Sequence, residues 1–162
     1  MHCIMDDISY HGKYWCYFTR LTTYIMTNAS RNTAKTGKCF EYWCHHLLDE
    51  RGYNVDEQIS IGLRPHGGEH NVDLIVNHED DTRDIISLKY QEVQGTAEEK
   101  IPYEQDCLQH ACETYGYNSA YIVLAGNGWT HRDAYIGGAF DKWHITPNVK
   151  VIDYDMFIGI YK

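Results

Sequence analysis

The chain has 162 residues, of which 43% are hydrophobic and 14% aromatic, so it can bury the core of one ordinary domain and is not intrinsically disordered. Its net charge of −9 weighs against a nucleic-acid partner, because affinity for phosphates comes from Lys and Arg, although carboxylates that bind divalent cations would contribute to the same charge. Residues 1–25 contain no apolar run suited to a signal peptide or a membrane span, which predicts a soluble cytoplasmic protein of prokaryotic or phage type.

The first predicted element is a helix over residues 28–51. Asn28 or Ser30 can cap its start, and Gly52 stands where a left-handed residue would end it. The apolar residues that recur at intervals of three and four, and that should face the core, are Phe40, Trp43, Cys44, Leu47 and Leu48.

Three strands are predicted next, over residues 53–63, 70–76 and 85–91. The first two are joined by the loop at 64–68, which contains Pro and two Gly residues. The last two are joined by a polar, acidic segment at 77–84, typical of a hairpin, so they should pair in antiparallel fashion.

A second helix is predicted over residues 103–115, with Pro102 in its first turn and Gly116 at its end. This order of elements predicts one domain with a mixed sheet and helices on its faces, a core at 28–125, an N-terminal extension at 1–25 and C-terminal elements at 126–162. The remaining predicted elements are strands at 120–125 and 149–152 and short helices at 130–135 and 154–160.

Asp73 and Lys89 are the strongest candidates for chemistry. They lie on the two strands that should pair, so their carboxylate and ammonium groups can converge on one phosphate. Mg²⁺ prefers hard oxygen ligands and keeps several waters, so one or two protein carboxylates suffice to hold it. Lys89 can then orient the attacking water and balance charge at the phosphate.

Three further residues can complete this site. Glu104 falls in the opening turns of the helix that follows the Lys89 strand and can supply a second carboxylate, with Glu99 as its closest competitor. Glu41 can supply another carboxylate if the first helix packs across the sheet. Gln91 shares a strand face with Lys89 and can position water or substrate by hydrogen bonding.

The ordered motifs resemble those of the PD-(D/E)XK phosphodiesterase superfamily, whose fold is shared by many type II restriction enzymes, archaeal Holliday junction resolvases and some homing endonucleases. The resemblance covers about residues 35–124. It is carried by Glu41 in a Gly-x-x-x-Glu segment, Asp73 in Val-Asp-Leu-Ile, and Ser87-Leu88-Lys89. Two positions depart from the family pattern: Val72 replaces Pro, and Ser87 stands where an acidic residue is usual.

The resemblance implies a restriction-endonuclease-like αβββαβ core. It also implies a Mg²⁺-dependent endonuclease that cuts DNA, with Mn²⁺ able to substitute and with Asp73, Glu104 and Glu41 as metal ligands. One branch of restriction enzymes has Ser-x-Lys with the glutamate moved onto the following helix, a role that fits Glu104. Because a DNA duplex has two strands, a homodimer or homotetramer is the natural form.

Other readings remain open at this point. A non-catalytic DNA-binding or assembly module that retains the fold is favoured by the negative charge and by Ser87. A metal hydrolase acting on small phosphoesters is a third possibility. His66, His70 and His78 surround the Asp73 strand, but their spacing matches no recognised zinc motif. The residues that would recognise DNA, and hence the choice between restriction, homing and junction resolution, cannot be read from the sequence.

Overall fold

The computed structural model describes residues 33–139 and 145–162, and the chain divides into two compact units, 1–36 and 37–162. The predicted N-terminal extension and the proposed caps Asn28 and Ser30 lie outside the described residues. In the part that is described, no helix is both long and apolar enough to span a membrane.

The elements follow the predicted order. The first helix, α2, and the three strands that follow it agree with the predicted boundaries to within two residues, apart from the start of α2. The bounds are α2 Thr33–Glu50, β1 Asn54–Leu63, β2 Glu69–Asn77, β3 Arg83–Tyr90, the 3-10 turn η1 Glu98–Lys100, α3 Ile101–Tyr115, β4 Ser119–Ala125, α4 Arg132–Ile136, β5 Val149–Asp153 and α5 Tyr154–Ile160.

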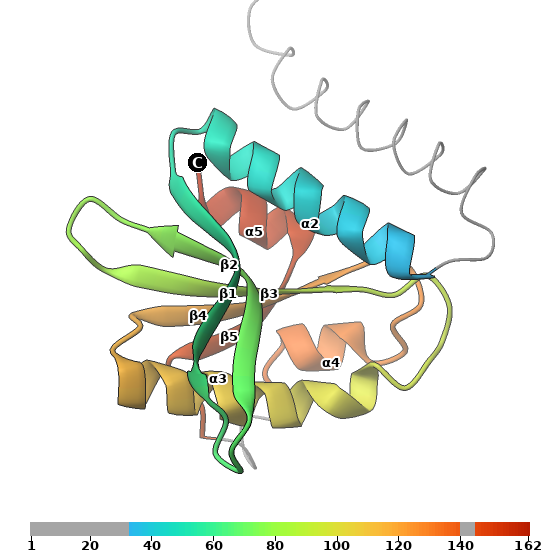
Figure 1. The fold of residues 1–162 in the computed structure, drawn as a ribbon. Helices are drawn as coiled ribbons and strands as arrows, with labels where there is room; N and C mark the ends of the chain where they lie inside the picture. The colour runs from blue at the N-terminus through green and yellow to red at the C-terminus, as the bar shows by residue number, and fades with distance from the viewer. Residues whose placement is uncertain (1–32, 140–144) are drawn as a thin grey trace, which may run out of the picture. The chain divides into compact units, whose positions relative to one another are not determined.

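The five strands form one mixed sheet in the order β1-β2-β3-β4-β5. β1, β2 and β3 pair in antiparallel fashion, whereas β3, β4 and β5 are parallel. Helices α2 and α5 lie on one face of the sheet, and α3 and α4 lie on the other (Figure 1). This is the predicted α/β architecture with a central mixed sheet flanked by helices, and it is consistent with a restriction-endonuclease-like fold.

The apolar face predicted for α2 does point into the protein, because Phe40, Cys44, Leu47 and Leu48 are buried. Trp43 is half-buried and donates from its indole N–H to the hydroxyl of Tyr154 on α5. The predicted packing of this helix against the core is therefore confirmed.

β1 exposes apolar side chains. Ile59 is 37% exposed and Leu63 is 53% exposed. β1 is an edge strand, and most of its residues are exposed on both faces of the sheet. Strand alternation alone does not reveal that a strand lies at an edge.

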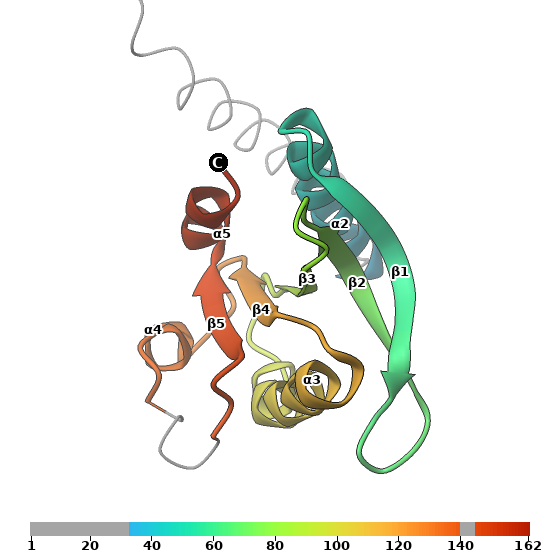
Figure 2. The ribbon, with the colours of Figure 1, turned by 90° about the vertical axis from the view of Figure 1, so that its left-hand side faces the viewer.

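The start and end of α3 are set by the residues that the sequence indicated. Pro102 lies in the first turn, and Gly116 ends the helix in the left-handed conformation with φ +73°. The loop between β1 and β2 lies beside this helix (Figure 2), and the backbone N–H of Leu63 donates to the Tyr115 hydroxyl at 2.9 Å. This contact brings the C-terminal end of α3 next to the end of β1, where the β1–β2 loop begins.

Candidate active site

The candidate site forms where two paired strands separate. β2 and β3 pair only as far as Leu74 opposite Ile86, whereas β3 stays paired with β4 as far as Tyr90 opposite Ala125. The end of β3 thus stays paired with β4 after it has separated from β2, which continues along β1. This separation, here called the β2–β3 fork, frees backbone groups of β3 for side-chain partners.

Asp73 is the first residue of β2 beyond the last strand pair and fills part of this fork. Its Oδ2 accepts a hydrogen bond from the backbone N–H of Leu88 at 2.6 Å, a group that a paired strand would otherwise use. The same oxygen lies 3.9 Å from Nζ of Lys89. The fork therefore holds a carboxylate beside an ammonium group, as the sequence predicted.

Lys89 connects the fork to α3 through Ser87. Lys89 Nζ donates to Ser87 Oγ at 2.7 Å, and Ser87 Oγ donates to Glu104 Oε1 at 2.9 Å. Lys89 Nζ also lies 3.6 Å from Glu104 Oε1. Glu104, and not its competitor Glu99, reaches the lysine, because Glu99 is exposed in the preceding turn η1.

Two more basic groups approach Glu104 from outside the predicted set. Arg64, at the start of the β1–β2 loop, places NH1 3.8 Å from Glu104 Oε2. Nε2 of His70, near the start of β2, lies 3.9 Å from Glu104 Oε1. Burial alone would raise the pKa of Glu104, but the His70 ring and the Lys89 ammonium contribute most to lowering it to about 2.

Asp73 and Glu41, the other two carboxylates, have raised pKa values, the opposite direction to Glu104. Burial raises the pKa of Asp73 above its usual value of 3.8, and the Lys89 ammonium only partly opposes this. Burial also raises the pKa of Glu41, and the neighbouring Asp73 carboxylate raises it further. Glu41 Oε2 accepts a hydrogen bond from Gln58 Nε2 at 3.0 Å. Glu41 on α2 is thus within electrostatic reach of the fork.

A divalent cation fits the chemistry of these donors. Among residues 33–139 and 145–162, no three His, Cys, Asp or Glu side chains already form a metal cluster. Lys89 lies near both Asp73 and Glu104, but at Asp73 the effect of burial outweighs that of the ammonium and the pKa stays raised. Carboxylate oxygens are the ligands that Mg²⁺ prefers, and one or two suffice.

A family model for the PD-(D/E)XK nuclease superfamily domain matches residues 32–158. The chain belongs to the PD-(D/E)XK nuclease superfamily. The match spans every described helix and strand except the last residues of α5. This membership agrees with the α/β fold and its five-stranded mixed sheet.

Two other comparisons add little to this assignment. A search of curated proteins finds no significant match. Among solved structures, the chain is similar to the crystal structure of AF1548, a protein of unknown function, with 15% sequence identity and a TM-score of 0.48. The similarity covers 71% of this chain and 56% of that one, so this chain corresponds to little more than half of AF1548.

Gln91, the remaining predicted residue of this nuclease-superfamily domain, is buried just beyond the end of β3. Its side-chain Nε2 donates to the carbonyl of Gly128 at 2.7 Å, and its own carbonyl accepts from the Gly128 N–H at 2.8 Å. Gly126 approaches so closely that an added Cβ would lie 2.3 Å from the Gln91 carbonyl oxygen. Gln91 therefore joins β3 to the turn after β4, and its amide hydrogen bond is used there.

Sequence reasoning did not include Gln58, Arg64 and His70 in the site. Gln58 has φ +50°, which is uncommon for a residue other than glycine, and its neighbours pair with Leu74 and Val72, so it lies beside Asp73. No local pattern marks such a backbone conformation. Arg64 and His70 were noticed only as a loop residue and a possible surface histidine, because their proximity to Glu104 depends on how the β1–β2 loop lies along α3.

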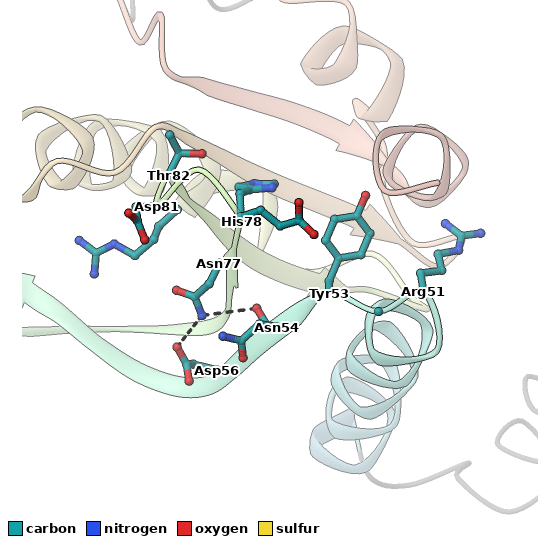
Figure 3. Close-up of a pocket in the computed structure, with 11 residues that line it drawn as sticks. Arg51, Tyr53, Asn54, Asp56, Asn77, His78, Asp81 and Thr82 are labelled. Carbon is teal, nitrogen blue, oxygen red and sulfur yellow. Dashed lines mark hydrogen bonds between the residues drawn. The ribbon is translucent and has the colours of Figure 1, made fainter.

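A separate pocket of about 780 Å³ lies at the other end of β2 and β3. Figure 3 shows its lining residues, with Asn77 donating to Asp56 Oδ2 at 2.9 Å and to the Asn54 carbonyl at 3.4 Å. None of Glu41, Asp73, Lys89 or Glu104 lines it. This pocket is thus distinct from the fork that holds the candidate site residues.

Proposed function

We propose that this protein is a metal-dependent endonuclease that hydrolyses phosphodiester bonds of DNA. The observation that carries the proposal is the β2–β3 fork, where Asp73 and Glu104 approach one lysine at 3.9 and 3.6 Å. The superfamily match supports nuclease chemistry in general. The choice of DNA, the dependence on metal and the roles of individual residues are the content of the proposal.

Asp73 and Glu104 would hold Mg²⁺, with Mn²⁺ as a substitute and with Glu41 as an additional or water-mediated ligand. A bound divalent ion supplies Lewis acidity and charge neutralisation at the phosphate. The chain contributes carboxylates of different character, since the pKa of Asp73 is raised and that of Glu104 is lowered to about 2. At neutral pH Glu104 is therefore ionised in advance, which favours cation binding.

Lys89 would act at the attacking water and at the phosphate. Its Nζ is held by Ser87 Oγ at 2.7 Å, and its side chain is 33% exposed, so the ammonium is both oriented and accessible. An ammonium in this position orients the water and stabilises negative charge that develops on the phosphate. Arg64, also partly exposed beside Glu104, is suited to contact a neighbouring phosphate of the backbone.

Gln91 has a supporting part in this scheme. Its amide is hydrogen-bonded to Gly128, so it would assist by fixing the end of β3 on which Lys89 lies. The cutting form would be a homodimer or homotetramer, because cleavage of both strands of a duplex is achieved most simply by two copies of one site.

Ser87 and Glu104 would together replace the acidic residue that this superfamily usually has two positions before the lysine. The hydrogen bond of 2.9 Å between Ser87 Oγ and Glu104 Oε1 supports this exchange, because it places the helix carboxylate directly over the serine position. A swap tests it. Glu104→Gln should lose Mg²⁺ binding, and the double variant Ser87→Asp with Glu104→Gln should regain part of it. If neither Asp nor Glu at position 87 restores Mg²⁺ binding in the Glu104→Gln background, the replacement is contradicted.

The direct test of the proposed function is incubation of supercoiled plasmid with the purified protein and Mg²⁺. We expect nicked and linear products from the wild-type protein and from Lys150→Ala, which removes an exposed lysine of β5. Lys89→Ala should abolish both products. Equal cleavage by Lys89→Ala and the wild type would contradict the proposal.

The net charge of −9 favours one alternative, a module that keeps the fold without cutting. Calorimetric titration with Mg²⁺ distinguishes the two. The endonuclease should bind the ion through Asp73 and Glu104, whereas such a module should release no heat of binding.

A further inference from the structure

His70 is buried without a hydrogen-bond partner. The residue is 1% exposed, and neither Nδ1 nor Nε2 has a partner. Within residues 36–139 and 145–162, whose side chains are described, the one other buried side-chain atom in this condition is Oε1 of Gln105. Buried polar groups are nearly always paired, so an unpaired imidazole calls for a specific explanation.

The polar atom that approaches His70 belongs to Glu104. Glu104 Oε1 lies 3.9 Å from His70 Nε2, which is beyond hydrogen-bonding distance. This oxygen is already engaged by Ser87 Oγ at 2.9 Å and by Lys89 Nζ at 3.6 Å. The carboxylate is therefore turned towards Lys89, and a modest rotation of its side chain would bring it within reach of the imidazole.

A carboxylate that ligates a metal gives one oxygen to the ion and needs a donor for the other. Groups that ligate metals are commonly held by such outer partners, which fix their orientation. Lys89 and Arg64 can both turn to phosphate when substrate binds, because their side chains are partly exposed. His70 is buried and cannot contact substrate, so it remains available to the carboxylate throughout.

We propose that His70 is a positioning residue, which donates from Nε2 to Glu104 and holds that carboxylate in its metal-binding orientation. The inference rests on the proposed function, because it takes Glu104 as a metal ligand. In this arrangement Nε2 carries the hydrogen, since a carboxylate can only accept. His70 acts through Glu104 alone and touches neither substrate nor the reacting atoms.

Three variants test this role by calorimetric titration with Mn²⁺ in the absence of DNA. His70→Gln places an amide nitrogen near the position of Nε2, whereas His70→Asn reaches only as far as Nδ1. Gln105→Met removes the other unpaired buried group and serves as the matched control, since Gln105 follows Glu104 on α3. Thermal unfolding of each variant establishes that it is folded at the titration temperature.

We expect His70→Asn to weaken Mn²⁺ binding by about 10- to 100-fold, the usual effect of losing an outer partner of a metal ligand. His70→Gln should stay within a few-fold of the wild type, and Gln105→Met should match it. In DNA cleavage, His70→Asn should need more Mg²⁺ for half-maximal rate and should recover most of its kcat at saturating Mg²⁺.

The outcomes separate the inference from the proposed function. Absence of Mn²⁺ binding by the wild-type protein would contradict the proposed function itself. Binding by the wild type together with equal affinity for His70→Asn would overturn the role of His70 alone. Equal losses in His70→Gln, His70→Asn and Gln105→Met would also overturn it, because they would reflect packing around α3 and no specific donor.

Discussion

Each end of the β2–β3 pair holds a carboxylate, and the two carboxylates differ in how many donors surround them. At one end, Asp84 of β3 is 5% exposed and is surrounded by donors: His78 Nε2 at 2.9 Å, the Tyr161 hydroxyl at 3.0 Å and Asn118 Nδ2 at 3.3 Å. At the other end, Asp73 accepts from one backbone N–H and shares Lys89 with Glu104. The first carboxylate is fully paired, and the second is not.

The two ends therefore differ in role: the paired Asp84 stabilises the fold, whereas the Asp73 end is the candidate active site. The donors around Asp84 come from the β2–β3 hairpin, from the loop before β4 and from the C-terminal end of the chain, so the network ties distant segments together. At the fork, burial raises the pKa of Asp73 and of Glu41, and a neighbouring carboxylate raises each further, so ionising these two groups costs stability. A bound cation would offset this cost, as the proposed function requires.

The largest expected effect is loss of cleavage in Asp73→Asn, by about 10³-fold or more, because a metal ligand at the reacting phosphate is removed. The same variant should be more stable than the wild type by about 1 kcal/mol at neutral pH. The pKa of Asp73 is raised, so its ionised form destabilises the folded state above that pKa. Plasmid cleavage and thermal unfolding measure the two effects.

Asp49→Asn removes one negative charge from an exposed position on α2 and serves as the control for Asp73→Asn. It should change neither cleavage nor stability. A loss of stability in Asp73→Asn would mean that its carboxylate is a structural group like Asp84.

Asp84→Ala should lower stability and leave Mg²⁺ affinity unchanged, the reverse of Asp73→Asn. Removing the Asp84 carboxylate leaves the Tyr161 hydroxyl and the His78 ring without their buried acceptor, which should destabilise the fold by about 3 kcal/mol. Urea unfolding measures the loss. Mg²⁺ affinity, measured at a temperature where the variant is folded, should equal that of the wild type. A large fall in Mg²⁺ affinity would show that the two ends are coupled.

Glu104→Gln should give a pH-dependent loss of stability of about 2 kcal/mol. The pKa of Glu104 is lowered from 4.5 to about 2, so its ionised form stabilises the folded state. That stabilisation is complete above about pH 4.5 and is lost as the pH falls towards 2. Urea unfolding of variant and wild type should therefore differ most near neutral pH and converge in acid. A difference that does not change with pH would contradict the assigned electrostatics.

The smallest effect is expected of Ser87→Ala. The hydroxyl links Lys89 to Glu104, and its loss removes two hydrogen bonds while both charged groups remain. We expect a loss of about 1 kcal/mol in the free energy of unfolding and less than a tenfold fall in cleavage rate. Denaturant unfolding and plasmid assays check both values. A loss as large as that of Asp73→Asn would make Ser87 a principal member of the site.

The sequence predicted most of the fold because residues that start and end helices and strands stand at clear positions. Gly52 and Gly116 mark the ends of helices, Pro102 marks a start, and the apolar run at β4 marks a buried strand. It also predicted that Asp73 and Lys89 lie on adjacent strands, since a short polar hairpin leaves little choice of pairing. These features depend on neighbours in the chain, which a single sequence displays.

The features that escaped prediction depend on contacts between distant segments. The fork arises because β2 leaves β3 at Leu74 while β3 continues along β4, and no residue type signals that point. The approach of Arg64 and His70 to Glu104 follows from the course of the β1–β2 loop along α3. Gln91 shares a strand face with Lys89 in sequence, yet the turn at Gly128 takes its amide.

Dependence of DNA cleavage on a divalent ion tests the central claim most directly. Supercoiled plasmid is incubated with metal-free protein, then with Mg²⁺, and finally with Mg²⁺ and excess EDTA. We predict cleavage in the second condition alone, because Asp73 and Glu104 act only when they share a cation. Cleavage without metal, or binding of Mg²⁺ with no cleavage of any DNA offered, would contradict the account.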